Sequence, residues 1–121
     1  MKKILALVFF IISLLVGNAY GGMTAEEWIN GYNDPRTTGQ AMSLLRGYIA
    51  GIANGIETMD AMFEAEGHNI RFFCVPNKLA LTTNQRIQML KGNLEVNPSI
   101  GKYTLGIAMF DSYKYTFPCK D

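Results

Sequence analysis

The chain has 121 residues, enough for one small domain, and carries a formal net charge of +1 with 17% charged residues. A balance this close to neutral supplies no basic surface for a phosphate backbone, so nucleic acid is not an expected partner. No block of like charges indicates electrostatic attachment to a membrane surface either.

The first 21 residues have the features of a secretory signal peptide. Lys2 and Lys3 form a positive start, and the apolar run over residues 4–16 is shorter than the roughly 20 residues of a membrane-spanning helix. Small residues follow, and cleavage is expected after Ala19 or Gly21. A mature domain of residues 22–121 would then be exported with no membrane attachment. The alternatives are a buried N-terminal helix or an uncleaved anchor.

Two helices are expected in the first half of the mature chain. Thr24, with Glu27 three residues later, predicts the start of a short helix that ends before Pro35. A much longer helix is predicted over residues 38–66, and Gly67 suits the left-handed position just past its end. Its buried face is expected to contain Ala41, Leu45, Tyr48, Ile49, Ile52, Ile56, Met59 and Phe63.

Three glycines recur every fourth residue in the long helix, at Gly47, Gly51 and Gly55. Each costs roughly 1 kcal/mol relative to alanine inside a helix, so the stripe indicates a close approach of another backbone. The first interpretation is packing against another helix of the same chain. The alternative is a contact between subunits.

The second half of the chain predicts two more helices after a connection over residues 68–81. Thr82 and Gln85 form a capping box for the third helix, and Asn97-Pro98 is expected to open the fourth. The inward residues are expected to be Ile87, Leu90 and Leu94 in the third helix, and Tyr103, Ile107 and Phe110 in the fourth. The predicted fold is therefore all-α, a small bundle of about four helices with one long central helix.

Two cysteines remain after signal cleavage, Cys74 and Cys119. An even number of cysteines in an exported protein favours a disulfide. The bridge would close a loop of 45 residues, which chain-entropy arguments value at about 3–4 kcal/mol. The alternative is a pair of reduced, buried thiols.

No pattern in the sequence indicates catalytic chemistry. His68 is the only histidine, so a nucleophile would have no other imidazole base. No cluster has metal-ligand spacing, and no glycine-rich loop follows a strand. Glu57, Asp60 and Glu64 are interpreted as a solvated helix face. We therefore expect a binding protein rather than an enzyme, with no cofactor and no metal.

Four segments in order resemble the Rap/Tai family of immunity proteins, which protect bacteria from peptidoglycan amidases delivered by type VI secretion. They are the helix segment Tyr48 to Gly55, the turn Phe73-Cys74-Val75-Pro76, the junction Leu90 to Pro98 and the closing Phe117-Pro118-Cys119. The resemblance covers residues 38–119. Asn54 departs from it, because an acid is common at this position in the family, and a further cysteine pair found in many members is absent.

The resemblance implies an all-helical periplasmic protein, often a homodimer, that binds a cell-wall amidase effector and blocks its cleft. It also implies that Cys74 and Cys119 pair with each other. The alternative function is a small periplasmic helical chaperone or stress protein. Proteins of that class resemble this chain in size, in cellular location and in having a single disulfide.

A plug for an enzyme cleft is expected to be a loop on a rigid scaffold. Two loops qualify, at residues 92–97 and 67–73. The first matches a family motif, which argues for a structural role. The inhibitory contact is therefore predicted in the second loop, where Phe73 is expected to enter the core. The predicted partner-binding residues are His68, Asn69, Arg71 and Phe72.

Overall fold

The computed structural model describes residues 22–76 and 79–120, which form an all-α domain. The elements are α2 (Ala25–Asn33), α3 (Gly39–Ala65), α4 (Thr83–Val96), the 3₁₀ helix η1 (Pro98–Lys102) and α5 (Leu105–Thr116). No strand longer than an isolated bridge occurs in these residues. The predicted fold class, with its long central helix, is confirmed. The expected signal peptide at residues 1–21 lies outside the described residues.

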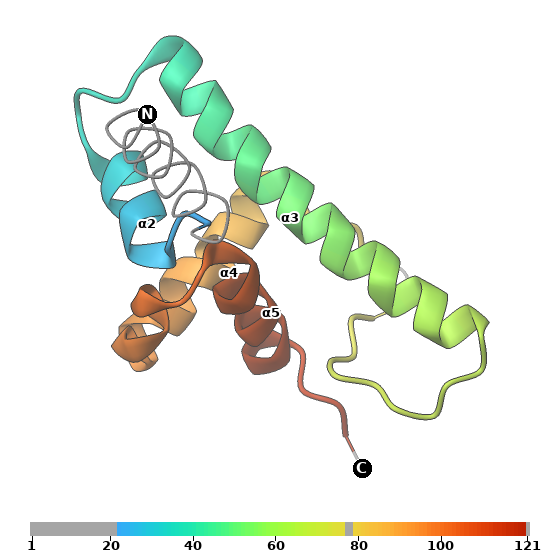
Figure 1. Cartoon of the computed structure of the whole chain (residues 1–121). Coiled ribbons are helices and arrows are strands. Elements are labelled where there is room, and N and C mark those ends of the chain that lie inside the picture. Colours follow the sequence, from blue (N-terminus) through green and yellow to red (C-terminus); the bar gives the residue numbers. More distant parts are fainter. Residues whose placement is uncertain (1–21, 77–78, 121) are drawn as a thin grey trace, which may run out of the picture.

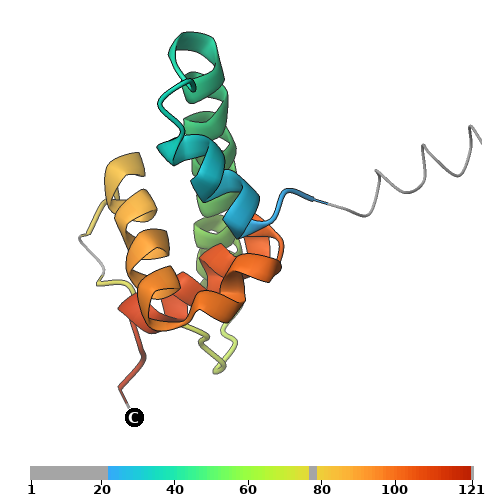
Figure 2. The same cartoon turned by 90° about the vertical axis from the view of Figure 1, so that its left-hand side faces the viewer.

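Helix α3 runs along one side of the molecule, and the other helices pack against part of its length (Figures 1 and 2). Its C-terminal half extends past the other helices and ends in the loop that leads to α4 (Figure 1). Trp28 of α2 is fully buried, and its indole N–H donates a hydrogen bond of 2.9 Å to the Leu45 carbonyl oxygen of α3. The largest buried side chains are Trp28, Ile49, Phe73, Ile87, Leu90, Leu105, Met109 and Tyr113.

Two predicted helix starts, at Thr24 and Thr82, and the predicted stop of the long helix are present. The side chain of Thr24 accepts a hydrogen bond from the Glu27 N–H, at 3.1 Å. Thr82 and Gln85 form both halves of the capping box that opens α4. At the end of α3, Gly67 has φ +74°. The N–H groups of Gly67 and His68 donate back to the carbonyls of the last turn, so α3 stops where the sequence predicts.

The buried face predicted for α3 is only partly correct. Ile49 and Ala53 are fully buried in the middle of the helix, whereas Tyr48, Met59 and Phe63 are exposed. Met59 and Phe63 lie in the C-terminal half of α3, which extends past the other helices (Figure 1). None of the helices in the described part of the chain is long and apolar enough to span a membrane.

The predicted fourth helix has the wrong start and the wrong buried face. Asn97-Pro98 opens only the 3₁₀ helix η1, and α5 begins seven residues after Pro98, at Leu105. Backbone hydrogen bonds set this start: the Ala25 N–H donates to the Tyr103 carbonyl at 3.0 Å, and the Leu105 N–H donates to the Met23 carbonyl at 2.8 Å. As a result Tyr103 and Ile107 are exposed and Phe110 is half-buried. The buried residues of α5 are Leu105, Ala108, Met109, Ser112 and Tyr113.

Candidate functional site

The disulfide pins the loop after α3 to the C-terminal end of the chain. Cys74 and Cys119 are bonded, with their Cα atoms 4.9 Å apart, which confirms the predicted disulfide. The Cys74 N–H also donates a hydrogen bond of 2.8 Å to the Phe117 carbonyl oxygen. The segment over residues 67–73 is therefore held at both ends, by the helix cap at Gly67 and by the disulfide.

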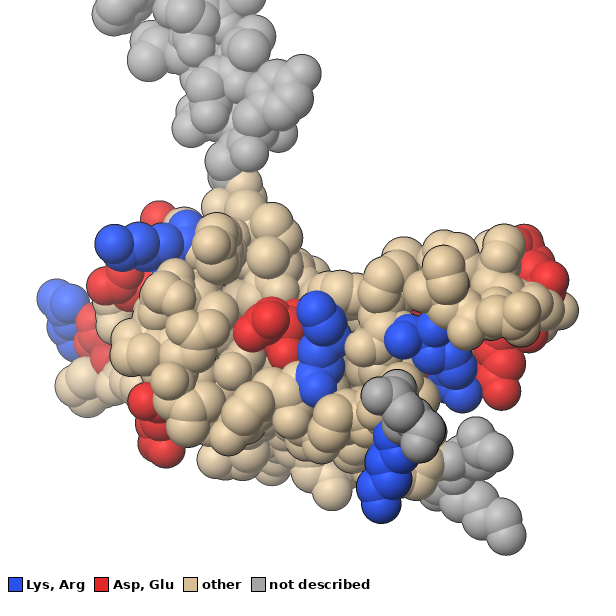
Figure 3. Space-filling view, turned by 90° about the horizontal axis from the view of Figure 1, so that it is seen from below, with Lys and Arg blue, Asp and Glu red and all other residues tan. Residues whose placement is uncertain are grey.

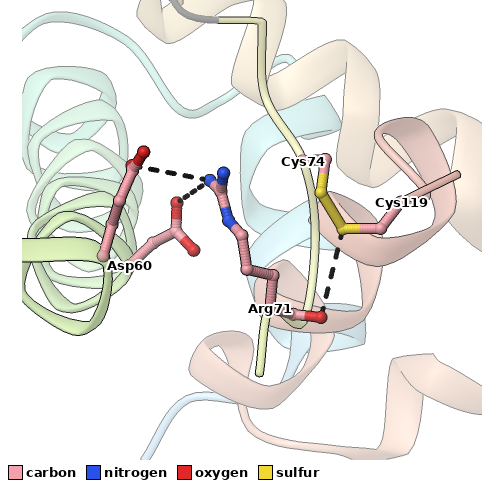
Figure 4. The surroundings of a disulfide bond; sticks show 5 residues. Asp60, Arg71, Cys74 and Cys119 are labelled. Atoms are coloured by element: carbon pink, nitrogen blue, oxygen red, sulfur yellow. Dashed lines mark hydrogen bonds and ion pairs between the residues drawn. A yellow bond between two sulfur atoms is a disulfide. The ribbon is translucent and has the colours of Figure 1, made fainter. Parts of the chain in front are cut away.

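Arg71 ties this loop back to α3 (Figure 4). Its guanidinium lies 3.2 Å from the Asp60 carboxylate and 3.8 Å from the Glu64 carboxylate. On the other side, the Arg71 carbonyl oxygen lies 4.0 Å from the Cys119 sulfur. The guanidinium of Arg71 is thus paired with carboxylates of the long helix, while its backbone lies next to the disulfide.

An aromatic cluster fills the space between the loop and α5. Phe73 is buried against Phe110 and Tyr113, with ring centroids 6.0 Å and 4.9 Å away, as expected for a core residue. Phe72 contacts Phe63 and Phe110 edge-on, at 6.3 Å and 5.5 Å between centroids. Phe72 nevertheless stays 46% exposed. It therefore both fastens the loop and presents an aromatic edge to solvent.

The tip of the loop is exposed. His68 and Asn69 are both exposed, and the His68 imidazole lies 3.1 Å from the Glu66 carboxylate. Between the predicted contact residues lies Ile70, which is 70% exposed and which the sequence analysis did not single out. A single isoleucine in a loop belongs to no helical or alternating pattern, so periodicity could not mark it.

Within residues 22–76 and 79–120, the glycine stripe of α3 does not face another helix. Apart from the nearby backbone of α3 itself, no heavy atom of these residues lies within 4 Å of a Cβ atom placed on Gly47, Gly51 or Gly55. All three glycines are exposed. The first interpretation of the stripe, packing inside the chain, is therefore wrong.

Two of the three carboxylates interpreted as a solvated face, Glu57 and Asp60, are instead bound by arginines, whereas Glu64 remains 58% exposed. Glu57 accepts a hydrogen bond of 2.6 Å from Arg86 of α4 and one of 2.7 Å from the Tyr113 hydroxyl of α5. Arg86 is buried and also donates to Asn54, at 3.2 Å. This polar network joins three helices, and Asp60 is likewise engaged by Arg71.

The network changes the titration of Tyr113. Burial, helped by the hydrogen bond to Glu57, raises the pKa of Tyr113 well above its ordinary value. The stabilising contribution of this tyrosine is therefore complete below pH about 10, the value of the unfolded chain, and is lost as the pH rises further.

The rest of the described surface has no metal-binding cluster, and the face in Figure 3 has no strongly charged patch. No group of three histidines, cysteines or carboxylates could hold a metal ion within residues 22–76 and 79–120. Lysines, arginines and carboxylates are scattered over the face in Figure 3, without a broad patch of one sign. The most distinctive feature is the pinned loop with its exposed tip.

No protein-family model, curated protein or solved structure matches the chain.

Proposed function

We propose that the chain is a periplasmic immunity protein that binds a peptidoglycan amidase effector of a type VI secretion system and inhibits it with the loop over residues 67–72. The observation that carries the proposal is this loop, which is fastened at both ends and exposed at its tip. A loop with restricted motion loses little conformational entropy when it enters a cleft. Inhibition of this kind requires no catalytic group from the chain.

The positions of the resembling segments support the proposal. Phe73-Cys74-Val75-Pro76 and Phe117-Pro118-Cys119 meet in the disulfide at the base of the loop. Leu90 to Pro98 covers the end of α4 and the start of η1. The segments that resemble the immunity family thus include the two that hold the loop.

The loop's chemistry specifies how it would bind. Ile70 and the Phe72 edge offer apolar contact, and His68 and Asn69 offer polar groups to a peptide-binding groove. Binding energy at an interface is concentrated in a few anchors that enter pockets and are surrounded by near-neutral contacts. Arg71 would act through its pairing with Asp60 and Glu64, by holding the backbone of the loop in place.

The triple variant His68→Ala, Asn69→Ala, Ile70→Ala tests the contact. These three side chains are exposed, so the melting temperature should stay nearly unchanged. Binding to the inhibited amidase should weaken at least tenfold, about 1.4 kcal/mol. The measurement is titration calorimetry, together with inhibition of peptide release from peptidoglycan by a panel of purified type VI amidases.

Ile107→Ala is the matched control, because Ile107 is an isoleucine of similar exposure, 57%, on α5 and outside the loop segment. It should leave binding unchanged. If the triple variant binds the amidase as tightly as the control does, the contact lies outside residues 68–70. Residues 92–97 would then be tested next. Failure of the chain to inhibit any amidase of the panel would contradict the immunity function itself.

Export is the second requirement of this function. Mass spectrometry of the protein recovered from the periplasm should give a mature N-terminus near Tyr20 or Gly22. Recovery there of a chain that still begins with Met1 would contradict cleavage. Recovery from the cytoplasm alone would contradict the proposed location.

The exposed apolar side chains of α3 favour a second candidate, a periplasmic chaperone. A chaperone binds unfolded clients of unrelated sequence through such surfaces. It should therefore suppress the aggregation of a reduced or heated client protein, whereas an immunity protein should act only on its amidase. A light-scattering assay with an unrelated client separates the two functions.

A further inference from the structure

A cavity of about 570 Å³ lies where α2, α4 and η1 meet, and it shares no residue with the loop over residues 67–73. Its apolar lining consists of Ile29, Leu94, Pro98 and Gly101. A Cβ atom placed on Gly101 would lie 3.5 Å from the Glu26 Cβ of α2 and 3.6 Å from the Leu94 Cδ2 of α4, so η1 packs closely against both helices. Cavities of this size hold small ligands in other proteins.

The same cavity is lined by four charged side chains, those of Glu26, Lys91, Glu95 and Lys102. None of them forms an ion pair with another side chain of residues 22–76 and 79–120. By contrast, the carboxylates of α3 near the loop are paired with arginines. Two positive and two negative groups around an apolar surface complement a ligand that carries one charge of each sign.

The side chain of Lys91 is held in place by its neighbours. Its Nζ lies 4.8 Å from the centroid of the Tyr32 ring, and this ring stacks on the fully buried Trp28, with the two centroids 5.0 Å apart. A cation is attracted to the face of an aromatic ring. The lysine side chain therefore has less conformational freedom to lose when a ligand binds.

The spacing of the charges on α4 indicates the length of the ligand. Lys91 and Glu95 are four residues apart, which is about 6 Å along a helix axis, and their flexible ends can lie somewhat further apart. An extended peptide spans about 3.3–3.6 Å per residue, so the charged ends of two or three residues lie roughly 7–10 Å apart. A single amino acid is shorter than this. It also has no peptide bond to pair with the side-chain amide of Asn33, which lines the cavity too.

We propose that this cavity binds a short peptide of two or three residues whose amino and carboxyl ends are both free. The carboxylate of the peptide faces Lys91 and Lys102. Its ammonium group faces Glu26 and Glu95, and small apolar side chains lie against the apolar lining. The Asn33 amide donates to or accepts from the peptide bond. This site does not depend on the proposed function, because neither the loop nor an amidase takes part in it.

Titration of the isotope-labelled chain with trialanine, followed by NMR, tests the class of ligand. The backbone amide signals of the residues that line the cavity should shift saturably, with a Kd of about 1 mM or tighter for a ligand of this size. N-acetyl-trialanine and trialanine amide have each lost one charge. Each should bind about tenfold more weakly, because a hydrogen bond to a charged group is removed. The peptide blocked at both ends should bind most weakly.

Two double variants test which charge binds which end. Lys91→Met with Lys102→Met should weaken the binding of trialanine about tenfold. It should leave the affinity for trialanine amide unchanged, since that ligand has no carboxylate. Glu26→Gln with Glu95→Gln should likewise weaken trialanine and leave N-acetyl-trialanine unchanged. A merely structural effect of these substitutions would weaken all the ligands alike.

Lys114→Met and Glu27→Gln are the matched controls, because both residues are exposed and neither lines the cavity. Both variants should bind trialanine as the wild type does. The absence of saturable shifts up to about 10 mM trialanine, ten times the expected Kd, would overturn the proposal. Dependence on only one of the two blocks would overturn it too, since that is the behaviour of a site for the chain end of a protein. Charge variants that bind every ligand like the wild type would contradict the placement in this cavity.

Discussion

Replacing Cys74 by serine should lower the free energy of unfolding by about 2–5 kcal/mol. The disulfide closes a loop of 45 residues, so its loss gives the unfolded chain far more conformations. The folded state loses the bond that joins the loop after α3 to the segment after α5. For a domain of about 100 residues, this is a large part of the total stability. Urea unfolding followed by circular dichroism measures the change.

Cys119→Ser and the double variant are the controls for this prediction. Both single variants break the same bond, so they should be destabilised to similar extents, and the double variant should cost about the same as either single one. Reduction of the wild-type protein should reproduce the effect. Rapid alkylation of both thiols in the native protein, or unfolding of the variants at the wild-type midpoint, would contradict the role of the bond.

The features that could be predicted from the sequence either depend on residues close together in the chain or, like the disulfide, leave few possible arrangements. A capping box needs only Thr82 and Gln85, three residues apart, and it is present in the structure. The stop at Gly67 needs only a glycine after a periodic run. The disulfide was predictable because two cysteines allow one pairing. In each case the signal is contained in the residues that make the contact.

The start of α5 shows why other features could not be predicted. Asn97-Pro98 is a good helix opening, yet the chain there forms only η1, because Tyr103 and Leu105 make backbone hydrogen bonds to the segment before α2. These contacts join residues about 80 positions apart. A local pattern carries no information about such a contact, so the predicted stripe was assigned to the wrong side of the helix.

The candidate site has the same division between local and long-range features. The exposure of His68 and Asn69 follows from a polar loop. The pairing of Arg71 with Asp60 depends on the loop folding back along α3, which the composition does not indicate. The solvent exposure of the glycine stripe likewise depends on how the other helices pack against α3, and this packing is seen only in the folded structure.

Glu57→Gln should destabilise the domain by about 3 kcal/mol, the lower end of the range for a broken buried ion pair. The side chain of Arg86 is only 10% exposed, and its Nε has no hydrogen-bond partner among the described residues. The variant leaves this guanidinium in the protein interior without a counter-ion. The lower end applies because Glu57 itself is 31% exposed, so water can partly compensate for its loss. Urea unfolding at neutral pH measures the effect.

The matched control is Arg86→Met, and the two variants should differ in the size of their effects. Methionine keeps the apolar stem of arginine and removes the charge. The Glu57 carboxylate that remains still accepts the Tyr113 hydroxyl and is in contact with water. We therefore expect a loss of about 1 kcal/mol, the value of an ordinary hydrogen bond. Equal losses in the two variants would contradict the view that the buried cation, rather than the pair as a whole, makes this network sensitive. A larger loss for Arg86→Met would assign the main role to the contact of Arg86 with Asn54 and to its packing between α3 and α4.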